Sequence, residues 1–415
     1  MRGTSSQRSL LDALPVLVPA ALLLLWIAHE SYQMDFRAFY VAGKSFLGSL
    51  DPYRNHAGRG AEFLDSANGL PGSRFYYPPT SALLFAPLAT LPYDVAKQLF
   101  SLLLALALLA VAVVSADGAE PTPWEAFLVA AVSMPVLTTF ERGQVDLLLV
   151  GAVLVAWRAA ASRRGAAPAA ALVALAGSVK IVPLALTGLW AAGHRLRLVG
   201  LVVLFSLVLW LLPLPLVGGE VYRSFVSQAA SVGEPLAPDA RLVSLQGFVG
   251  FFSPDGVGLA VTEDEAKYVL RYDLSGHFVH RVNPLALLGR PACVVLGAAL
   301  MAYLAHRTRR TGAFSQLVAT LPALNVLNPM AWTMGLVWFL PFFLSRYGRA
   351  TAIGRLALLV PLFLPGPLTV FGFGPEAVLS IAVVAGFLAA DEGRRGWTGL
   401  LRAPAHEASP VNAQP

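Results

Sequence analysis

Charged residues are scarce in this 415-residue sequence. Only 13% of the residues are Asp, Glu, Lys or Arg, whereas 56% are hydrophobic. Such a composition excludes a soluble globular protein of this length and predicts an all-α polytopic membrane protein. Apolar runs recur from residue 10 to residue 390 without a separate soluble region. We therefore expect one integral membrane domain over residues 1–395, followed by a disordered cytoplasmic tail over 396–415.

Cysteine and the common enzyme motifs are also lacking. Cys293 is the only cysteine, which excludes a disulfide or a thiolate pair within the chain. The seven histidines show no metal-ligand spacing, and no phosphate loop, HExxH, GxSxG or dinucleotide fingerprint occurs. The net charge of +6 comes from arginine clusters beside apolar runs, without interleaved aromatic residues. We expect no metal, no cofactor and no nucleic-acid partner.

Basic residues at the ends of the apolar runs predict the topology, because cytoplasmic loops are enriched in Lys and Arg. Arg2 and Arg8 precede the first run, residues 10–28, which is longer than the hydrophobic region of a signal peptide. We expect it to be a retained span with a cytoplasmic N-terminus. Residues 30–78 then form a first extracytoplasmic loop, and residues 218–283 form a second one.

Several apolar runs depart from a simple span. Residues 79–92 are bounded by prolines and are too short to cross a bilayer, so a re-entrant or interfacial segment is expected. Residues 166–192 and 312–345 are interrupted at GSVKIVP and LNP and have basic residues at both ends, which predicts two broken hairpins. Residues 124–140 and 198–217 are expected to be single crossings. The total is about ten to twelve transmembrane or re-entrant helices.

Polar residues beside or within these runs are the candidate site, because charges at membrane depth usually face a cavity or a partner. A solvated and idle side chain is the alternative near an interface, and Lys180 has the alternative of extending to the membrane surface. Asp146 needs a partner, and Arg142 four residues earlier would share its helix face. The candidates are Asp35 with Arg37, Glu141 and Arg142 with Gln144 and Asp146, Arg241 with Gln246, and Lys180.

Six segments follow one another between residues 30 and 345: MDFRAFYVAGKSFLGSLDPY, FYYPPTSALLFAPLATLP, ERGQVDLLLVGAVLVAW, GSVKIVPLAL, SLQGF and NPMAWTMGLVWFLP. Their content and order resemble glycosyltransferase family 87. The resemblance implies a GT-C fold and transfer of a hexose, mannose in most members, from a polyprenyl-phosphate-linked donor. It further implies a lipid or glycan acceptor on the extracytoplasmic side of a bacterial inner membrane, with the bilayer, the donor and the acceptor as partners.

Two other classes of protein stay open from the residues alone. A lipid or sugar transporter or flippase also contains broken helices and charges within the membrane, although here the polar residues and both long loops gather on the outer side. A structural subunit of an envelope assembly is the third class. It would leave Asp35, Asp146 and Lys180 without a role.

The family resemblance also implies roles for individual residues. Asp35 stands where the family has a catalytic carboxylate, which takes the proton of the acceptor hydroxyl as general base. Cations stabilise the leaving phosphate, and Arg37, Arg142, Lys180 and Arg241 are the candidates. The candidates for sugar or acceptor binding are Tyr76, Tyr77, Gln144, Asp146, Gln246 and His277. Tyr76 and Tyr77 have interfacial packing as an alternative.

The sequence departs from the family near its last motif. Met334 and Gly335 stand where the family often has histidine. Either histidine is dispensable in this chain, or His277 or His280 replaces it. A third alternative is a changed donor or acceptor.

Overall fold

The computed structural model describes ten ranges: residues 10–31, 33–53, 75–116, 122–162, 164–231, 295–303, 305–306, 313–327, 333–347 and 352–363. These ranges consist of helices and short turns, without a strand, so the all-α class is confirmed. Arg241, Gln246, His277, His280 and Cys293 lie outside the described residues, as does most of the second predicted loop.

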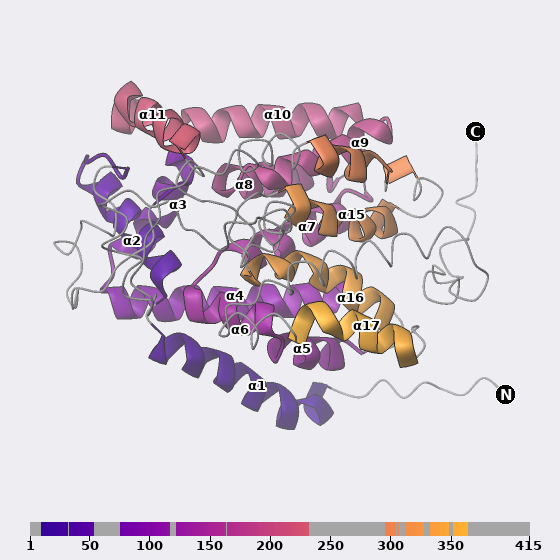
Figure 1. The fold of residues 1–415 in the computed structure, drawn as a ribbon. Helices are drawn as coiled ribbons and strands as arrows, with labels where there is room; N and C mark the ends of the chain where they lie inside the picture. The colour runs from indigo at the N-terminus through magenta and orange to yellow at the C-terminus, as the bar shows by residue number, and fades with distance from the viewer. Residues whose placement is uncertain are drawn as a thin grey trace, which may run out of the picture.

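The labelled elements in Figure 1 are α-helices, and 3₁₀ helices marked η. They are α1 (Leu10–Glu30), α2 (Met34–Leu47), α3 (Pro79–Ala89), α4 (Tyr93–Ser115), α5 (Pro123–Ala131), α6 (Met134–Arg142), α7 (Asp146–Ala159), α8 (Ala166–Val179), η2 (Val182–Leu186), α9 (Thr187–Ala192), α10 (Leu196–Leu211), α11 (Leu214–Ser231), α15 (Ala313–Leu327), η3 (Thr333–Phe339), α16 (Leu340–Tyr347) and α17 (Ala352–Phe363).

Helix α4, with 23 residues, is long and apolar enough to cross a membrane, and two bent helix pairs in the described chain would each qualify as one broken span. The pair α5 and α6 bends by 64°, and the pair α10 and α11 bends by 92°. We expected single crossings at both places. Pro135 in the first turn of α6 explains the first bend, because proline has no N–H to bond the Ala131 carbonyl and its ring would clash with that carbonyl in a continuous helix. Helix α11 continues past residue 218, where the second loop was expected to begin.

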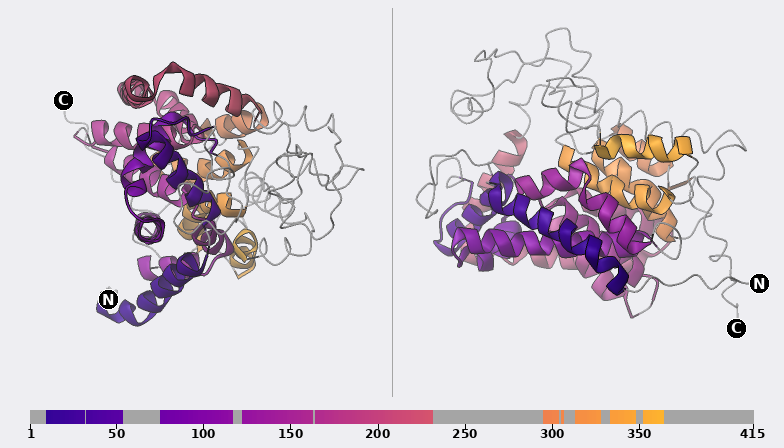
Figure 2. Two further views of the ribbon diagram at one scale, coloured as in Figure 1. Left: turned by 90° about the vertical axis from the view of Figure 1, so that its left-hand side faces the viewer. Right: turned by 90° about the horizontal axis from the view of Figure 1, so that it is seen from below.

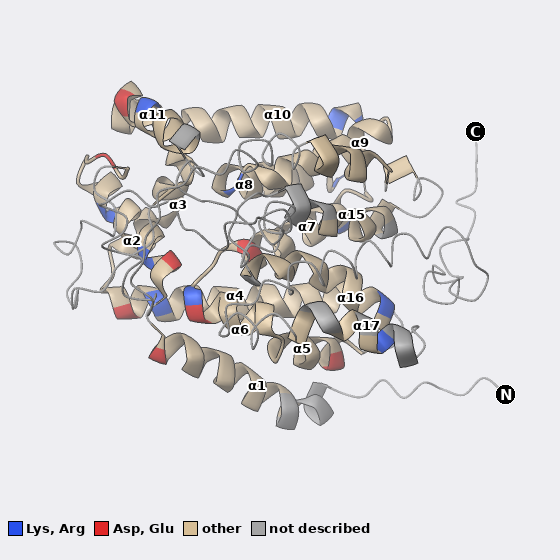
Figure 3. Ribbon diagram, in the orientation of Figure 1, with Lys and Arg blue, Asp and Glu red and all other residues tan. Residues whose placement is uncertain are grey.

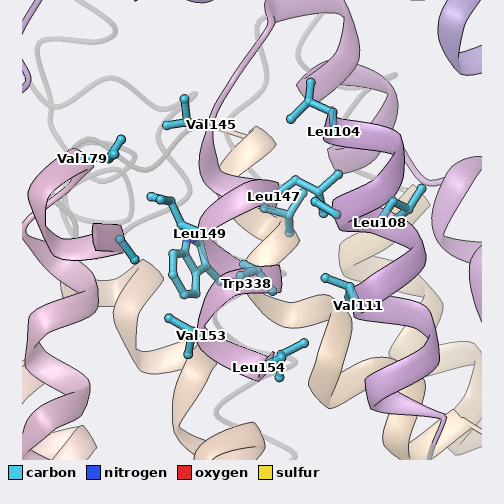
Figure 4. Packing of buried hydrophobic residues seen from close by; sticks show 14 of the residues in the cluster. Leu104, Leu108, Val111, Val145, Leu147, Leu149, Val153, Leu154, Val179 and Trp338 are labelled. Carbon is cyan, nitrogen blue, oxygen red and sulfur yellow. The ribbon is translucent and has the colours of Figure 1, made fainter. Parts of the chain in front are cut away.

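The core is a set of helices that pack successively side by side. Helix α4 packs on α7, α7 on α8, and α8 on α10, while α1 and α10 lie at opposite edges of the molecule (Figures 1 and 2). Figure 3 shows long stretches of α4, α8 and α10 without charged residues. Figure 4 shows side chains that fill the space between α4 and α7: Leu104, Leu108, Val111, Leu147 and Leu154.

Helices α2 and α3 pack closely together at one end of the molecule. A Cβ atom on Gly43 would lie 2.9 Å from the Ala89 Cβ, so glycine at this position permits the close approach of the two helices. The rings of Phe39 and Phe85 stack across the same interface with centroids 4.4 Å apart. The 11 residues of α3 are too few to cross a bilayer, in agreement with the expected re-entrant or interfacial segment.

The first predicted helix interruption is present. Helix α8 ends at Val179, Lys180 adopts an extended conformation with φ −133° and ψ 132°, and η2 follows. The hydroxyl of Ser81 in α3 donates to the Ser178 carbonyl at 3.1 Å, which satisfies one acceptor at the end of α8. The second predicted interruption, at LNP, falls on residues 328–332, which lie outside the described residues. Entry of these segments from the cytoplasmic side stays a prediction.

Candidate functional site

Asp35 lies in the first turn of α2 and its side chain is half-buried. Gln33, the residue before the start of α2, has φ 47° and ψ 57°. This left-handed conformation starts α2 in a new direction after α1. A carboxylate in the first turn is favourable, because the backbone N–H groups there carry partial positive charge. The Oδ2 atom of Asp35 accepts a hydrogen bond from the Gln144 Nε2 at 3.2 Å.

Gln144 lies in the short turn between α6 and α7, and Gly143 determines the path of that turn. Gly143 has φ +69°, and a Cβ atom on it would lie 2.5 Å from the Phe36 Cβ. Only glycine fits without strain, because it has no Cβ and adopts positive φ readily. The turn therefore contacts α2 directly. Gln144, only 7% exposed, is held beside Asp35.

Tyr77 precedes α3 and connects several groups of the site. Its hydroxyl donates to the Gln144 Oε1 at 3.4 Å, and its ring centroid lies 4.2 Å from that of Phe39. Its carbonyl accepts from the Tyr53 hydroxyl at 2.7 Å. Burial raises the pKa of Tyr77 well above its ordinary value, and the negative charges of Asp35 and Asp146 raise it further, against the opposing hydrogen bond with Gln144.

Asp146 is the first residue of α7 and is 4% exposed. Its Oδ2 atom lies 2.6 Å from the Lys180 Nζ, and its Oδ1 atom accepts from the Trp338 indole at 3.0 Å. The predicted pairing of Asp146 with Arg142 was wrong. Helix α6 ends at Arg142 and α7 begins at Asp146, so no continuous helix places the two residues on one face. The Arg142 guanidinium instead contacts the Met34 sulfur.

Tyr77 joins the Asp35 side of the site to the Lys180 side. The Lys180 Nζ lies 5.9 Å from the centroid of the Tyr77 ring, within the range of a cation–π contact. We call the resulting group the polar cluster. It consists of Asp35, Tyr77, Gln144, Asp146, Lys180 and Trp338.

The other predicted site residues in the described ranges lie on α2, at the end of α6 and just before α3. Arg37 follows Asp35 by two residues, about 200° around the helix, and is 2% exposed. Its electrostatic neighbour is Tyr93, at the start of α4. Tyr76 is half-buried and Glu141 is exposed. The roles predicted for Arg37, Arg142 and Tyr76 stay predictions.

Trp338 was missed as a site residue. The signal was present, because the indole N–H of a tryptophan in an apolar run requires an acceptor. Figure 4 shows the Trp338 ring beside Leu149. Gly335 precedes Trp338 by three residues in η3, and residues three apart in a 3₁₀ helix lie on the same side. The position where the family often has histidine therefore lies on the side of η3 that faces Asp146.

The described residues contain no group of three or more His, Cys, Asp or Glu side chains that could hold a metal ion. The site instead combines two carboxylates, one lysine and hydrogen-bonding side chains, in a helical membrane protein with bent helix pairs. This is the class of protein that the fold and the site define.

Comparison with known sequences identifies the family. The model of glycosyltransferase family 87 matches residues 75–328, more than half of the chain, and the chain belongs to this family. The chain is also 30% identical over 277 residues to a protein of Mycolicibacterium smegmatis named polyprenol-phosphate-mannose-dependent alpha-(1-2)-phosphatidylinositol pentamannoside mannosyltransferase. That match covers 64% of this chain and 59% of the relative. The resemblance seen in the sequence is thus confirmed.

Proposed function

We propose that this protein is a membrane glycosyltransferase that transfers mannose from a polyprenyl-phosphate-linked donor to a glycolipid or glycan acceptor. Family membership and the name of the mycobacterial relative support the donor class. The observation that carries the proposal is the polar cluster, in which Tyr77 contacts the Lys180 ammonium through its ring and Gln144, the partner of the Asp35 carboxylate, through its hydroxyl. A base and a cation are the two groups that sugar transfer from a phosphate requires.

The proposed reaction is a single inverting displacement. The acceptor oxygen bonds to the anomeric carbon of mannose, while the bond between that carbon and the phosphate oxygen breaks and its electron pair leaves with polyprenyl phosphate. The Asp35 carboxylate takes the proton from the acceptor hydroxyl. Lys180 stabilises the charge of the leaving phosphate without a metal ion.

Asp146 has a supporting role in this proposal, although the sequence suggested sugar or acceptor binding. Its carboxylate accepts one hydrogen bond from the Lys180 ammonium, which has three N–H donors in total. The ammonium therefore has capacity for a phosphate oxygen while Asp146 holds it in place. We propose that the site opens to the extracytoplasmic side of a bacterial inner membrane, because Asp35 and Tyr77 lie in the first predicted outer loop.

The test is transfer from labelled polyprenyl-phosphate mannose by the purified protein in liposomes that contain a glycolipid extract. We expect Asp35→Asn to lower transfer at least about 100-fold. Asp94→Asn is the control, because Asp94 also lies in the first turn of a helix but its side chain is 77% exposed. It should transfer at the wild-type rate.

Two results would contradict the proposal. Full transfer by Asp35→Asn would remove Asp35 from the mechanism. An intact donor that crosses the bilayer in the presence of wild-type protein would instead identify a transporter.

A further inference from the structure

The contacts of Gln144 differ from those expected of a sugar-binding residue. We propose that Gln144 is a positioning residue whose side-chain amide orients the Asp35 carboxylate and favours its ionised form. This inference rests on the proposed function, in which Asp35 is the general base.

The direction of the Gln144 amide follows from its neighbours. The backbone N–H of Val145 can only donate, and it donates to the Gln144 Oε1 at 3.0 Å. The Tyr77 hydroxyl donates to the same oxygen at 3.4 Å. With the oxygen end of the amide held by two donors, the nitrogen end faces the Asp35 Oδ2 at 3.2 Å.

The backbone around Gln144 makes this arrangement rigid. Gly143, before Gln144, has a positive φ and packs closely against Phe36 of α2. Val145, after Gln144, is buried. Neither end of the amide can turn toward a substrate without the loss of a hydrogen bond, the buried one from the Val145 N–H or the half-buried one to Asp35. Leaving a buried group unpaired costs about 1–3 kcal/mol. The donated N–H stabilises the charged carboxylate and directs one of its oxygens.

Other ionisable groups lie on the elements around Asp35. The charges of Asp35 and Asp146 both act on Tyr77, and α2 itself carries Arg37, Tyr40 and Lys44. Helix α3 has no ionisable side chain. The ionisable groups on the two other helices packed against α2 are Tyr93, Asp94 and Lys97 on α4, and Glu141 and Arg142 on α6.

The sharpest test is Gln144→Glu. The new side chain keeps one oxygen to accept from Val145 and Tyr77, and places its second oxygen against the Asp35 Oδ2. Two carboxylates in this position share a proton, so the pKa of the pair rises. We expect the titration of Asp35 to move upward by at least about one pH unit.

The titration is measured by infrared spectroscopy of the protonated carboxyl band, with Asp35→Asn subtracted to assign the signal. The acid limb of the transfer rate against pH should move upward by the same amount as the titration. Gln144→Met, which removes the hydrogen bond without adding charge, should give a smaller upward shift. It should also give a lower kcat at an unchanged acceptor KM. If Gln144→Glu does not insert into membranes, Gln144→Met provides the test.

Gln316→Glu is the matched control. The Gln316 amide donates to the Ala305 carbonyl at 2.9 Å and is half-buried. Gln316 lies on α15, which contacts α7 where the Trp157 indole donates to the Ala313 carbonyl. Trp157 is about 16 Å along α7 from Asp146. This variant should leave both the Asp35 titration and the pH profile unchanged.

Two results would overturn the inference: an Asp35 titration that stays in place in both Gln144 variants, or a raised acceptor KM with an unchanged pH profile. The infrared titration does not depend on turnover. Wild-type protein that transfers no mannose would therefore refute the proposed function, while the titration would still decide the role of Gln144.

Discussion

Lys180 and Asp146, 34 residues apart in the sequence, form an ion pair with 2.6 Å between Nζ and Oδ2, in which Asp146 is buried and Lys180 is half-buried. The indole of Trp338 donates to the other carboxylate oxygen of Asp146 at 3.0 Å. Trp338 lies 192 positions after Asp146 in the sequence. Three separate parts of the chain thus satisfy one buried carboxylate. An aspartate at the start of α7 is tolerated in an apolar surrounding because a cation and a second donor both contact it.

Lys180→Met should abolish measurable mannose transfer and lower the free energy of unfolding by about 3 kcal/mol, because it leaves the Asp146 charge buried and unpaired. The double variant Lys180→Met with Asp146→Asn removes that unpaired charge. It should recover most of the lost stability while transfer stays absent. Thermal unfolding in detergent and the liposome assay measure the two effects. Recovery of transfer in the double variant would show that Lys180 does not act on the donor phosphate.

Trp338→Phe should lower the free energy of unfolding by about 2 kcal/mol more than Trp190→Phe does, because it removes a hydrogen bond to a charged group. Trp190 is the matched control. It is buried to a similar extent, and its Nε1 has no hydrogen-bond partner within the described ranges. Both substitutions remove comparable ring volume, and phenylalanine at position 190 can keep the stack on Trp157, so their difference reports mainly the indole hydrogen bond. Equal losses of stability would contradict the contact with Asp146.

Gly143→Ala should lower the free energy of unfolding by at least about 2 kcal/mol, because alanine at φ +69° is strained and its Cβ would meet Phe36. Transfer should also fall, since Gln144 would move away from Asp35. Gly200→Ala in α10 is the control, because a Cβ atom there meets no described atom within 4 Å. It should leave stability unchanged or raise it by up to about 1 kcal/mol. The same unfolding assay compares the two variants.

Tyr77 should stay protonated above pH 10, because its pKa is raised well above the ordinary value of 10.0. As the pH rises past the ordinary pKa, the unfolded chain releases this proton and the folded protein retains it. The contribution of Tyr77 to stability is therefore complete below about pH 10 and decreases at higher pH. The ultraviolet difference spectrum between wild type and Tyr77→Phe measures the ionisation. A phenolate signal from Tyr77 that emerges at pH 10 would contradict the burial of its hydroxyl.

Much of the architecture could be predicted from local sequence. The interruption at Lys180 was readable because Pro183 and a lysine divide an apolar run, and the short α3 was readable from its bounding prolines. Bends within α5–α6 and α10–α11 were missed, because their hydropathy is continuous across the break, although Pro135 marked the first break in the sequence. Hydropathy reports whether a residue prefers an apolar surrounding. It does not report the direction of the helix axis.

Site chemistry was only partly readable. Asp35, Lys180 and Asp146 were singled out because ionisable groups in apolar surroundings need an explanation. Pairing Asp146 with Arg142 failed because one glycine, Gly143, ends the helix between them. Spacing along the sequence predicts contacts only where a helix is continuous.

The sequence by itself determined that this protein is helical, that it belongs in a membrane, and which residues carry its charges in apolar runs. Those properties follow from composition and local patterns, because each apolar residue contributes independently to the transfer from water to lipid. Only the tertiary structure decided that Lys180 and Trp338 hold Asp146, and that Gln144 turns its amide nitrogen toward Asp35. These contacts join segments distant in sequence, and their geometry depends on how whole helices pack against one another.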